Sequence, residues 1–155
     1  MSQSLTVTST INIQASAATV WDALTNPEMT KKYMFGCEAV SDWKPGSPLL
    51  WKGKFNGLEM VAVKGNVIKI EPGKRLVYTT IDPNNPAVPD LPENYLTVTY
   101  DLSEQDGHTL LTVSQGDYST VAEGGKRYEE TIAGGGWTPI LVQIKELIEK
   151  EGRNA

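Results

Sequence analysis

Between residues 38 and 115, segments in which apolar and polar residues alternate follow one another along the chain. Side chains of a strand point alternately to its two sides, so this alternation predicts strands that bury one face. Pro45-Gly46 and Pro72-Gly73 fit the central positions of type II turns, and Asp106-Gly107 is typical of a hairpin. We therefore expect an antiparallel sheet with strands over 38–43, 49–55, 61–71, 75–81, 95–102 and 109–115.

The residues before this run predict one further strand and two short helices. Alternation over 5–13 indicates a half-buried strand. Ser16 is a candidate N-cap for a helix that carries Trp21, and Pro27 ends that helix. Because proline also suits the first turn of a helix, a second short helix is expected over 28–34.

The C-terminal segment is predicted to be an amphipathic helix that covers the apolar face of the sheet. Three glycines, Gly134 to Gly136, disagree with an uninterrupted helix, because each costs about 1 kcal/mol relative to alanine in a helix interior. Two alternatives remain open. Either the helix begins near Trp137 with Pro139 in its first turn, or one long helix begins near Lys126 and is kinked at the glycines.

In the third predicted strand, the apolar residues change from odd to even positions. Gly65 lies close to this change, so a bulge or bend is expected there. The segment 82–92 holds four prolines and is predicted to be an exposed loop.

Composition places the 155 residues in one domain, 1–155, with enough apolar material for one core, since 39 % of the residues are hydrophobic. The net charge of −5 argues against a nucleic-acid partner and against a polybasic membrane contact. A single cysteine excludes a disulfide within the chain, and a secretory signal or membrane-spanning stretch is not expected. A cytoplasmic location is the expectation.

Several strings resemble a known superfamily. The segment Ala15-Ser-Ala-Ala-Thr-Val-Trp-Asp-Ala-Leu-Thr-Asn-Pro-Glu28 resembles the opening of START-like, Bet v 1-like domains (SRPBCC superfamily). The closest subgroup is the one related to the activator of Hsp90 ATPase. Three further strings fit and extend the resemblance over about 6–150: Ser41-Asp42-Trp43 with Gly46-Ser-Pro-Leu-Leu-Trp51, Gly65-Asn-Val-Ile-Lys-Ile-Glu-Pro72, and Gly136-Trp137 with Ile140-Leu141 and Leu147.

The resemblance implies an α+β helix-grip (Bet v 1-like) fold. In such a fold a curved antiparallel sheet of about six to seven strands wraps around the long C-terminal helix, with two short helices after the first strand. An apolar cavity is expected between the sheet and that helix. The resemblance is specific for the fold and says little about function, because such domains bind lipids, hormones and polyketides, catalyse cyclisation or act as co-chaperones.

Aromatic residues are the candidates for lining such a cavity. An aromatic ring offers a large apolar face, and tyrosine or tryptophan adds one polar tip that orients a ligand. For each candidate the alternative is that it simply fills the core. The predicted ligand-binding residues are Trp21, Tyr33, Met34, Trp51, Glu59, Tyr78, Tyr95, Glu129, Gly136 and Trp137, with the glycine allowing close approach to the backbone.

Catalytic and metal-binding motifs are weak in this sequence. Glu59 and Glu129 are candidate carboxylates that either point into the cavity or face solvent. His108, the single histidine, adjoins a predicted turn, and Cys37 is expected to be a small buried hydrophobe. We therefore assign no catalytic residue and expect no metal site and no cofactor.

Three functions remain open at this stage. The first is binding of a small apolar or amphipathic molecule between the sheet and the C-terminal helix. The second is a cyclase- or dehydratase-like enzyme in which Glu59, Glu129 or Tyr95 acts as acid or base. The third is an Hsp90 co-chaperone-like module that binds a protein partner. We favour the first, and the chain is expected to be either a monomer or a homodimer.

Overall fold

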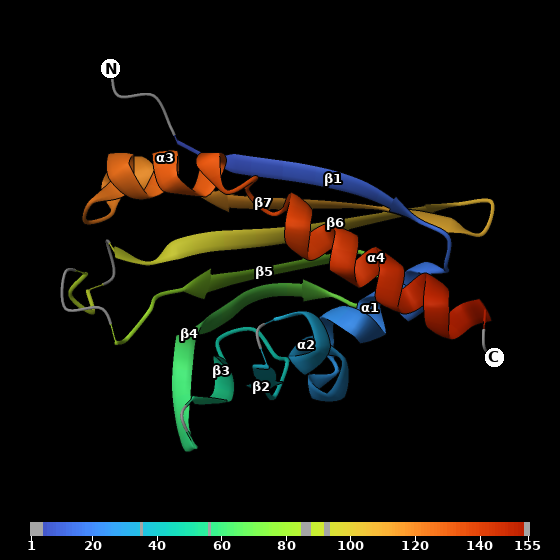
Figure 1. Cartoon of the computed structure of the whole chain (residues 1–155), viewed down its shortest axis with the longest axis horizontal. Helices are drawn as coiled ribbons and strands as arrows, with labels where there is room; N and C mark the ends of the chain where they lie inside the picture. Colours follow the sequence, from blue (N-terminus) through green and yellow to red (C-terminus); the bar gives the residue numbers. More distant parts are fainter. Residues whose placement is uncertain (1–4, 35, 56, 85–87, 92–93, 154–155) are drawn as a thin grey trace.

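Seven strands form one antiparallel sheet in the order β1-β7-β6-β5-β4-β3-β2, as Figure 1 shows. The computed structural model describes residues 5–34, 36–55, 57–84, 88–91 and 94–153. Every strand after β2 pairs with its predecessor in sequence, and β1 joins the sheet beside β7. The strands are β1 Val7–Ile13, β2 Glu38–Ser41, β3 Pro48–Phe55, β4 Leu58–Glu71, β5 Arg75–Thr80, β6 Leu96–Gln105 and β7 His108–Gly116.

Both predicted Pro-Gly turns are present. Gly46 has φ +87° and Gly73 has φ +77°, the left-handed region that the third residue of a type II turn requires. The closing hydrogen bonds run from Ser47 N to Lys44 O and from Lys74 N to Glu71 O, each 2.9 Å. These turns fix the β2–β3 and β4–β5 connections, and the hairpin predicted at Asp106-Gly107 joins β6 to β7.

Two irregularities of pairing bend β4 and curve the sheet. In the pairing of β4 with β3, Ala62 is an extra residue between two paired neighbours. In the pairing of β4 with β5, Ile68 is the extra residue. Each extra residue reverses the inside–outside alternation, which explains the change of parity in this segment. The bend expected near Gly65 is confirmed, and the bulges lie on either side of that glycine; the turn of β4 is visible in Figure 1.

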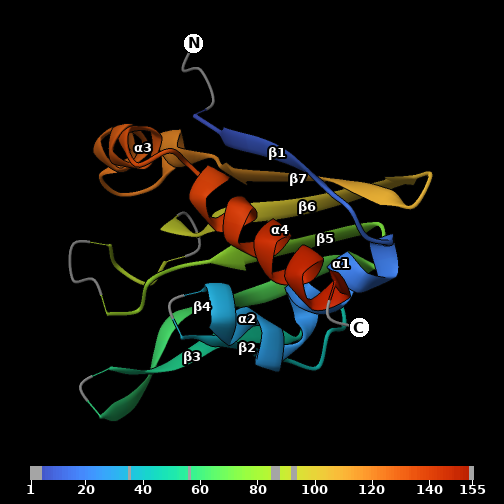
Figure 2. The same cartoon turned by 45° about the vertical axis from the view of Figure 1, so that its right-hand side comes forward.

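Two short helices follow β1, as expected. α1, Ala17–Thr25, begins after Ser16, whose side chain accepts from Thr19 N. α2, Pro27–Tyr33, begins with proline after Asn26, whose side chain accepts from Glu28 N at 3.0 Å. Both lie on the same side of the sheet as the C-terminal helix (Figure 2).

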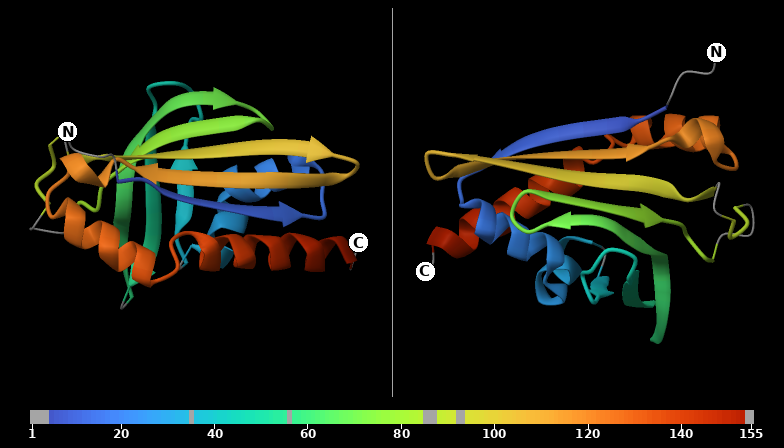
Figure 3. Two further views of the ribbon diagram at one scale, coloured as in Figure 1. Left: turned by 90° about the horizontal axis from the view of Figure 1, so that it is seen from above. Right: turned by 180° about the vertical axis from the view of Figure 1, so that it is seen from behind.

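The C-terminal segment consists of two helices separated by the glycines. α3, Gly124–Ala133, follows the short 3-10 helix η2, Tyr118–Thr120, and α4 is Thr138–Arg153 with proline in its first turn. The alternative in which the long helix begins after the glycines is therefore confirmed, while residues before them form a separate helix. Figure 3 shows α3 and α4 on one side of the sheet. No helix among the described residues is long and apolar enough to cross a membrane.

The core lies between the inner face of the sheet and α4. Leu141, Ile144 and Ile148 form the buried stripe of that helix at spacings of three and four. They join the buried side chains of the sheet, among them Ile13, Val98, Tyr100, Leu111 and Val113, in one cluster. The buried stripe continues to Ile148, whereas Ile140 in the first turn of α4 is only partly buried.

Candidate functional site

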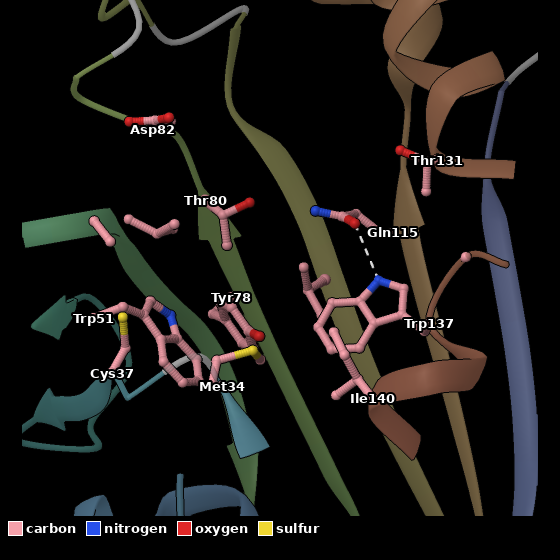
Figure 4. Close-up of a pocket in the computed structure, with 14 residues that line it drawn as sticks. Met34, Cys37, Trp51, Tyr78, Thr80, Asp82, Gln115, Thr131, Trp137 and Ile140 are labelled. Atoms are coloured by element: carbon pink, nitrogen blue, oxygen red, sulfur yellow. Dashed lines mark hydrogen bonds between the residues drawn. The ribbon is translucent and has the colours of Figure 1, made fainter. Parts of the chain in front are cut away.

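A cavity of about 500 Å³ lies between the inner face of the sheet and the first turn of α4. One part of its wall is apolar and is formed mainly by Met34, Trp51, Tyr78, Trp137 and Ile140. The other part carries the polar side chains, and Figure 4 shows these two parts at opposite ends of the view. The polar residues are Thr80, Asp82, Gln115 and Thr131.

A row of four aromatic rings, three of which line the cavity, runs from β3 to the residue before α4. Trp51 and Tyr78 have ring centroids 6.3 Å apart, and Tyr78 and Tyr100 have centroids 5.6 Å apart. The edge of one ring then meets the face of the other between Tyr100 and Trp137, at 6.0 Å. Tilted and edge-to-face pairs at these distances are favourable. They hold the cavity wall in a defined shape.

Gln115 anchors Trp137 at the polar end. Its Oε1 accepts from Nε1 of Trp137 at 3.0 Å and from the hydroxyl of Tyr118 at 3.1 Å. The indole N–H is only a donor, so the atom that it meets must be the amide oxygen. The side-chain amide of Gln115 is thereby held in one orientation.

Three tyrosines, one at the end of α2 and two in the sheet, are buried in the core, and burial is the main reason why their pKa values are raised. The pKa of Tyr78 and that of Tyr33 lie well above the usual value, and that of Tyr100 is raised as well. The Tyr33 hydroxyl donates to the backbone oxygen of Ala23 at 2.7 Å. At neutral pH all three are therefore uncharged.

These raised pKa values predict a loss of stability at alkaline pH. Above about pH 10 the unfolded chain releases phenolic protons that the folded chain keeps, so the free energy of unfolding falls as the pH rises. Each buried tyrosine contributes a slope of up to about 1.4 kcal/mol per pH unit, and below pH 9 none of them contributes a slope. Absorbance of tyrosinate should show Tyr33, Tyr78 and Tyr100 ionising only together with unfolding. Their ionisation in the folded protein near pH 10 would contradict the structure.

The structure places five of the ten predicted ligand-binding residues in the cavity wall and five outside it. The five in the wall are Met34, Trp51, Tyr78, Gly136 and Trp137. Two others belong to the core, since Tyr33 is fully buried and Trp21 is half-buried against the same cluster. The ligand-binding role of the residues in the wall stays a prediction.

The three predicted acid–base residues also lie away from the cavity. The Tyr95 hydroxyl donates to Asp90 at 2.6 Å, and Glu129 is exposed on α3. Glu59 lines a second hollow of about 470 Å³ at the β2–β3–β4 edge, where it lies with Glu38, Lys52 and Lys54. The carboxylate in the cavity wall is instead Asp82, an exposed residue just beyond β5.

Sequence reasoning missed the polar end of the cavity. Gln115 has the same parity as Leu111 and Val113, the buried apolar residues of its strand. Thr80 likewise continues the face of Tyr78. A polar residue that ends an apolar face is the signal that points to these positions.

The described side chains indicate neither a metal-binding site nor a reactive thiol. Among the described residues no group of three histidine, cysteine, aspartate or glutamate side chains is arranged to hold a metal ion. Cys37 is buried in the cavity wall, and burial raises the pKa of its thiol. A protonated thiol in this position acts as a small apolar group.

Comparison with known proteins identifies the family. A family model described as "Activator of Hsp90 ATPase homolog 1-like protein" matches residues 14–149. The chain belongs to this family. The START-like, Bet v 1-like assignment made from the sequence is thus confirmed, together with the helix-grip fold. A search of curated proteins finds no match.

Several solved structures share the fold over most of the chain. The solution structure of a Cytophaga hutchinsonii protein has 32 % identity and a TM-score of 0.74, covering 99 % of both chains. A Nitrosomonas europaea protein has 21 % identity and the same TM-score and coverage. The Aha1 dimer from Colwellia psychrerythraea has 19 % identity and a TM-score of 0.66, with 93 % of this chain and 96 % of that chain covered.

Proposed function

We propose that this protein binds a small, neutral, largely apolar molecule in the cavity between the sheet and α4. The observation that supports the proposal most is the cavity itself, whose volume of about 500 Å³ lies within the usual range for small-molecule sites. Its aromatic wall suits a flat ring system, and its polar end offers groups that orient one. Family membership adds a fold that accommodates such a cavity.

The charge of the wall narrows the ligand class. Among the described residues that line the cavity there is no lysine or arginine, and the one ionisable carboxylate is Asp82. A negatively charged ligand would lose its hydration without gaining a counter-charge. The proposal therefore favours uncharged molecules over fatty acids and other anions.

The two alternative functions receive less support from the same observations. The acid–base residues considered for an enzyme, Glu59, Glu129 and Tyr95, lie outside the cavity wall. Exposed large apolar side chains that a protein partner would cover come singly from several elements, among them Val40 of β2, Leu58 of β4 and Ile132 of α3. The cavity therefore supports ligand binding more strongly than these residues support either alternative.

Two fluorescent probes with the same ring skeleton test the proposal. The neutral N-phenyl-1-naphthylamine is expected to bind with a dissociation constant on the order of 10–100 µM, as its size allows. The related anion 8-anilinonaphthalene-1-sulfonate should bind at least about tenfold more weakly, because its sulfonate meets no cation in the wall. Titration of probe fluorescence measures both. Equal or tighter binding of the anion would argue against a neutral ligand.

A cavity-filling substitution shows whether the probe enters this site. Ala62→Trp places an indole at the half-buried wall of β4 and should weaken binding of N-phenyl-1-naphthylamine by tenfold or more. Ile68→Trp is the matched control, since Ile68 lies on the same strand, is 54 % exposed and does not line the cavity. Circular dichroism establishes that both variants are folded. Unchanged affinity in the folded Ala62→Trp variant would place the probe elsewhere.

A further inference from the structure

The hydrogen bond between the hydroxyls of Tyr78 and Tyr100 involves only one of their two protons. The two hydroxyl oxygens are 2.9 Å apart, and both side chains are about 99 % buried. Each phenol carries one proton, and one of the two is consumed by the hydrogen bond between them. Within the described part of the chain, neither hydroxyl has another hydrogen-bonding partner. One buried donor is therefore available.

The available donor belongs to the cavity side of the pair. Tyr78 lines the cavity and Tyr100 does not. If Tyr78 donated to Tyr100, the remaining proton would be enclosed in the core, which costs about 1–3 kcal/mol for an unsatisfied donor. When Tyr100 donates to Tyr78, the remaining proton is carried by Tyr78, the residue of the pair that lines the cavity. Accepting one hydrogen bond also makes the Tyr78 hydroxyl a stronger donor.

Gln115 supplies a second donor of fixed direction. Because its oxygen already accepts from Trp137 and Tyr118, the amide NH₂ is the end that remains for a ligand. Figure 4 shows the amide nitrogen directed away from Trp137, toward Thr80 across the cavity. The cavity thus has a donor in its aromatic part, at Tyr78, and a donor at its polar end, at Gln115.

We propose that these two donors select neutral, flat ligands that carry two hydrogen-bond-accepting oxygens, carbonyl or ether, one bound by Tyr78 and the other by Gln115. This inference rests on the proposed function, since it specifies the ligand class of the same cavity. An isostere without acceptors leaves both donors unpaired when it displaces water from them, and it is therefore disfavoured. The ring system supplies the apolar contact, and the oxygens supply the selectivity.

A series of three naphthalenes tests the selection on the wild-type protein. 2-Acetyl-6-methoxynaphthalene carries an acceptor at each end, 2-acetylnaphthalene carries one, and 2-isopropenylnaphthalene replaces the carbonyl oxygen with a methylene group. Each acceptor is expected to tighten binding about three- to tenfold, the usual gain from one hydrogen bond. The indole N–H signal of Trp137 in NMR titrations reports occupancy of the cavity.

Three variants connect the selection to the two donors. Tyr78→Phe leaves Gln115 as the one proposed donor, so it should reduce the preference for 2-acetyl-6-methoxynaphthalene over 2-acetylnaphthalene to less than twofold. Tyr100→Phe removes one hydroxyl from the same pair but keeps that of Tyr78, so the preference should persist. Gln115→Glu keeps an oxygen for Trp137 and replaces the NH₂ donor with an acceptor, and it should weaken binding of the two-acceptor compound tenfold or more.

The possible outcomes separate this inference from the proposed function. If all three naphthalenes bind the wild-type protein equally, or if folded Tyr78→Phe retains the preference for the two-acceptor compound over 2-acetylnaphthalene, the inference is wrong and cavity binding stands. If none of the three binds while Trp137 remains in its folded environment, the proposed function itself is contradicted, and this inference falls with it.

Discussion

Replacing Gly65 with alanine is expected to destabilise the protein by at least about 3 kcal/mol. A Cβ at this position would lie 1.6 Å from the backbone oxygen of Thr79 and 2.4 Å from its carbonyl carbon. Backbone atoms cannot move aside as a flexible side chain does, so β4 and β5 would have to separate. The backbone bonds between Lys64 and Ile81, 2.9 and 2.8 Å long, lie beside this contact and would be lost or stretched.

Thermal unfolding followed by circular dichroism measures this effect. A loss of about 3 kcal/mol lowers the Tm by roughly 6–12 °C for a chain of this length. Gly125→Ala is the matched control, because a Cβ there meets nothing within 4 Å and the residue lies in α3. That substitution should leave the Tm unchanged or raise it slightly. A Gly65→Ala variant as stable as the control would contradict the close approach of the β4 and β5 backbones at Gly65.

Replacing Trp137 with alanine is expected to cost about 3–5 kcal/mol, the range for large aromatic residues in a core. The indole is 7 % exposed, contacts the ring of Tyr100 edge-on and donates to Gln115. It also forms the boundary between the cavity and the first turn of α4, so its loss removes the wall on which a ligand rests. The same variant should bind N-phenyl-1-naphthylamine at least about tenfold more weakly.

A graded pair of variants separates the ring from its polar tip. Trp137→Phe keeps an aromatic ring and loses the bond to Gln115, so its cost should be smaller, about 1–2 kcal/mol. Val142→Ala, at a position 38 % exposed on α4, should cost less than about 1 kcal/mol. Chemical denaturation gives all three values. A Trp137→Ala variant within 1 kcal/mol of the wild type would contradict the role of the indole as an anchor.

The sheet and its helices could be predicted because their signals are local. Alternation, Pro-Gly turns and the Ser16 cap each depend on a few neighbouring residues, and the structure confirms them. The parity change near Gly65 predicted a bulge or bend, but not that there would be two bulges or where they would lie. Two bulges, at Ala62 and Ile68, produce it, and their positions depend on pairing with two different strands.

The candidate site was predicted only in part because it depends on directions that periodicity does not fix. Trp51, Tyr78 and Trp137 were found because large aromatic residues on inner faces border the space beside the helix. Tyr95 lies outside the cavity wall, and its hydroxyl is bound to Asp90 of the proline-rich segment. Gln115 was missed because a polar residue at a strand end resembles a solvent-exposed one until its partner, Trp137, is known.

The central claim is that a neutral guest lies between the sheet and the first turn of α4. Intermolecular nuclear Overhauser effects on the complex with N-phenyl-1-naphthylamine test it most directly. We predict contacts from the bound probe to the indole of Trp137 and the ring of Tyr78, which face the same cavity. Contacts confined to exposed apolar residues such as Leu58 or Ile132, with none to Trp137, would contradict it.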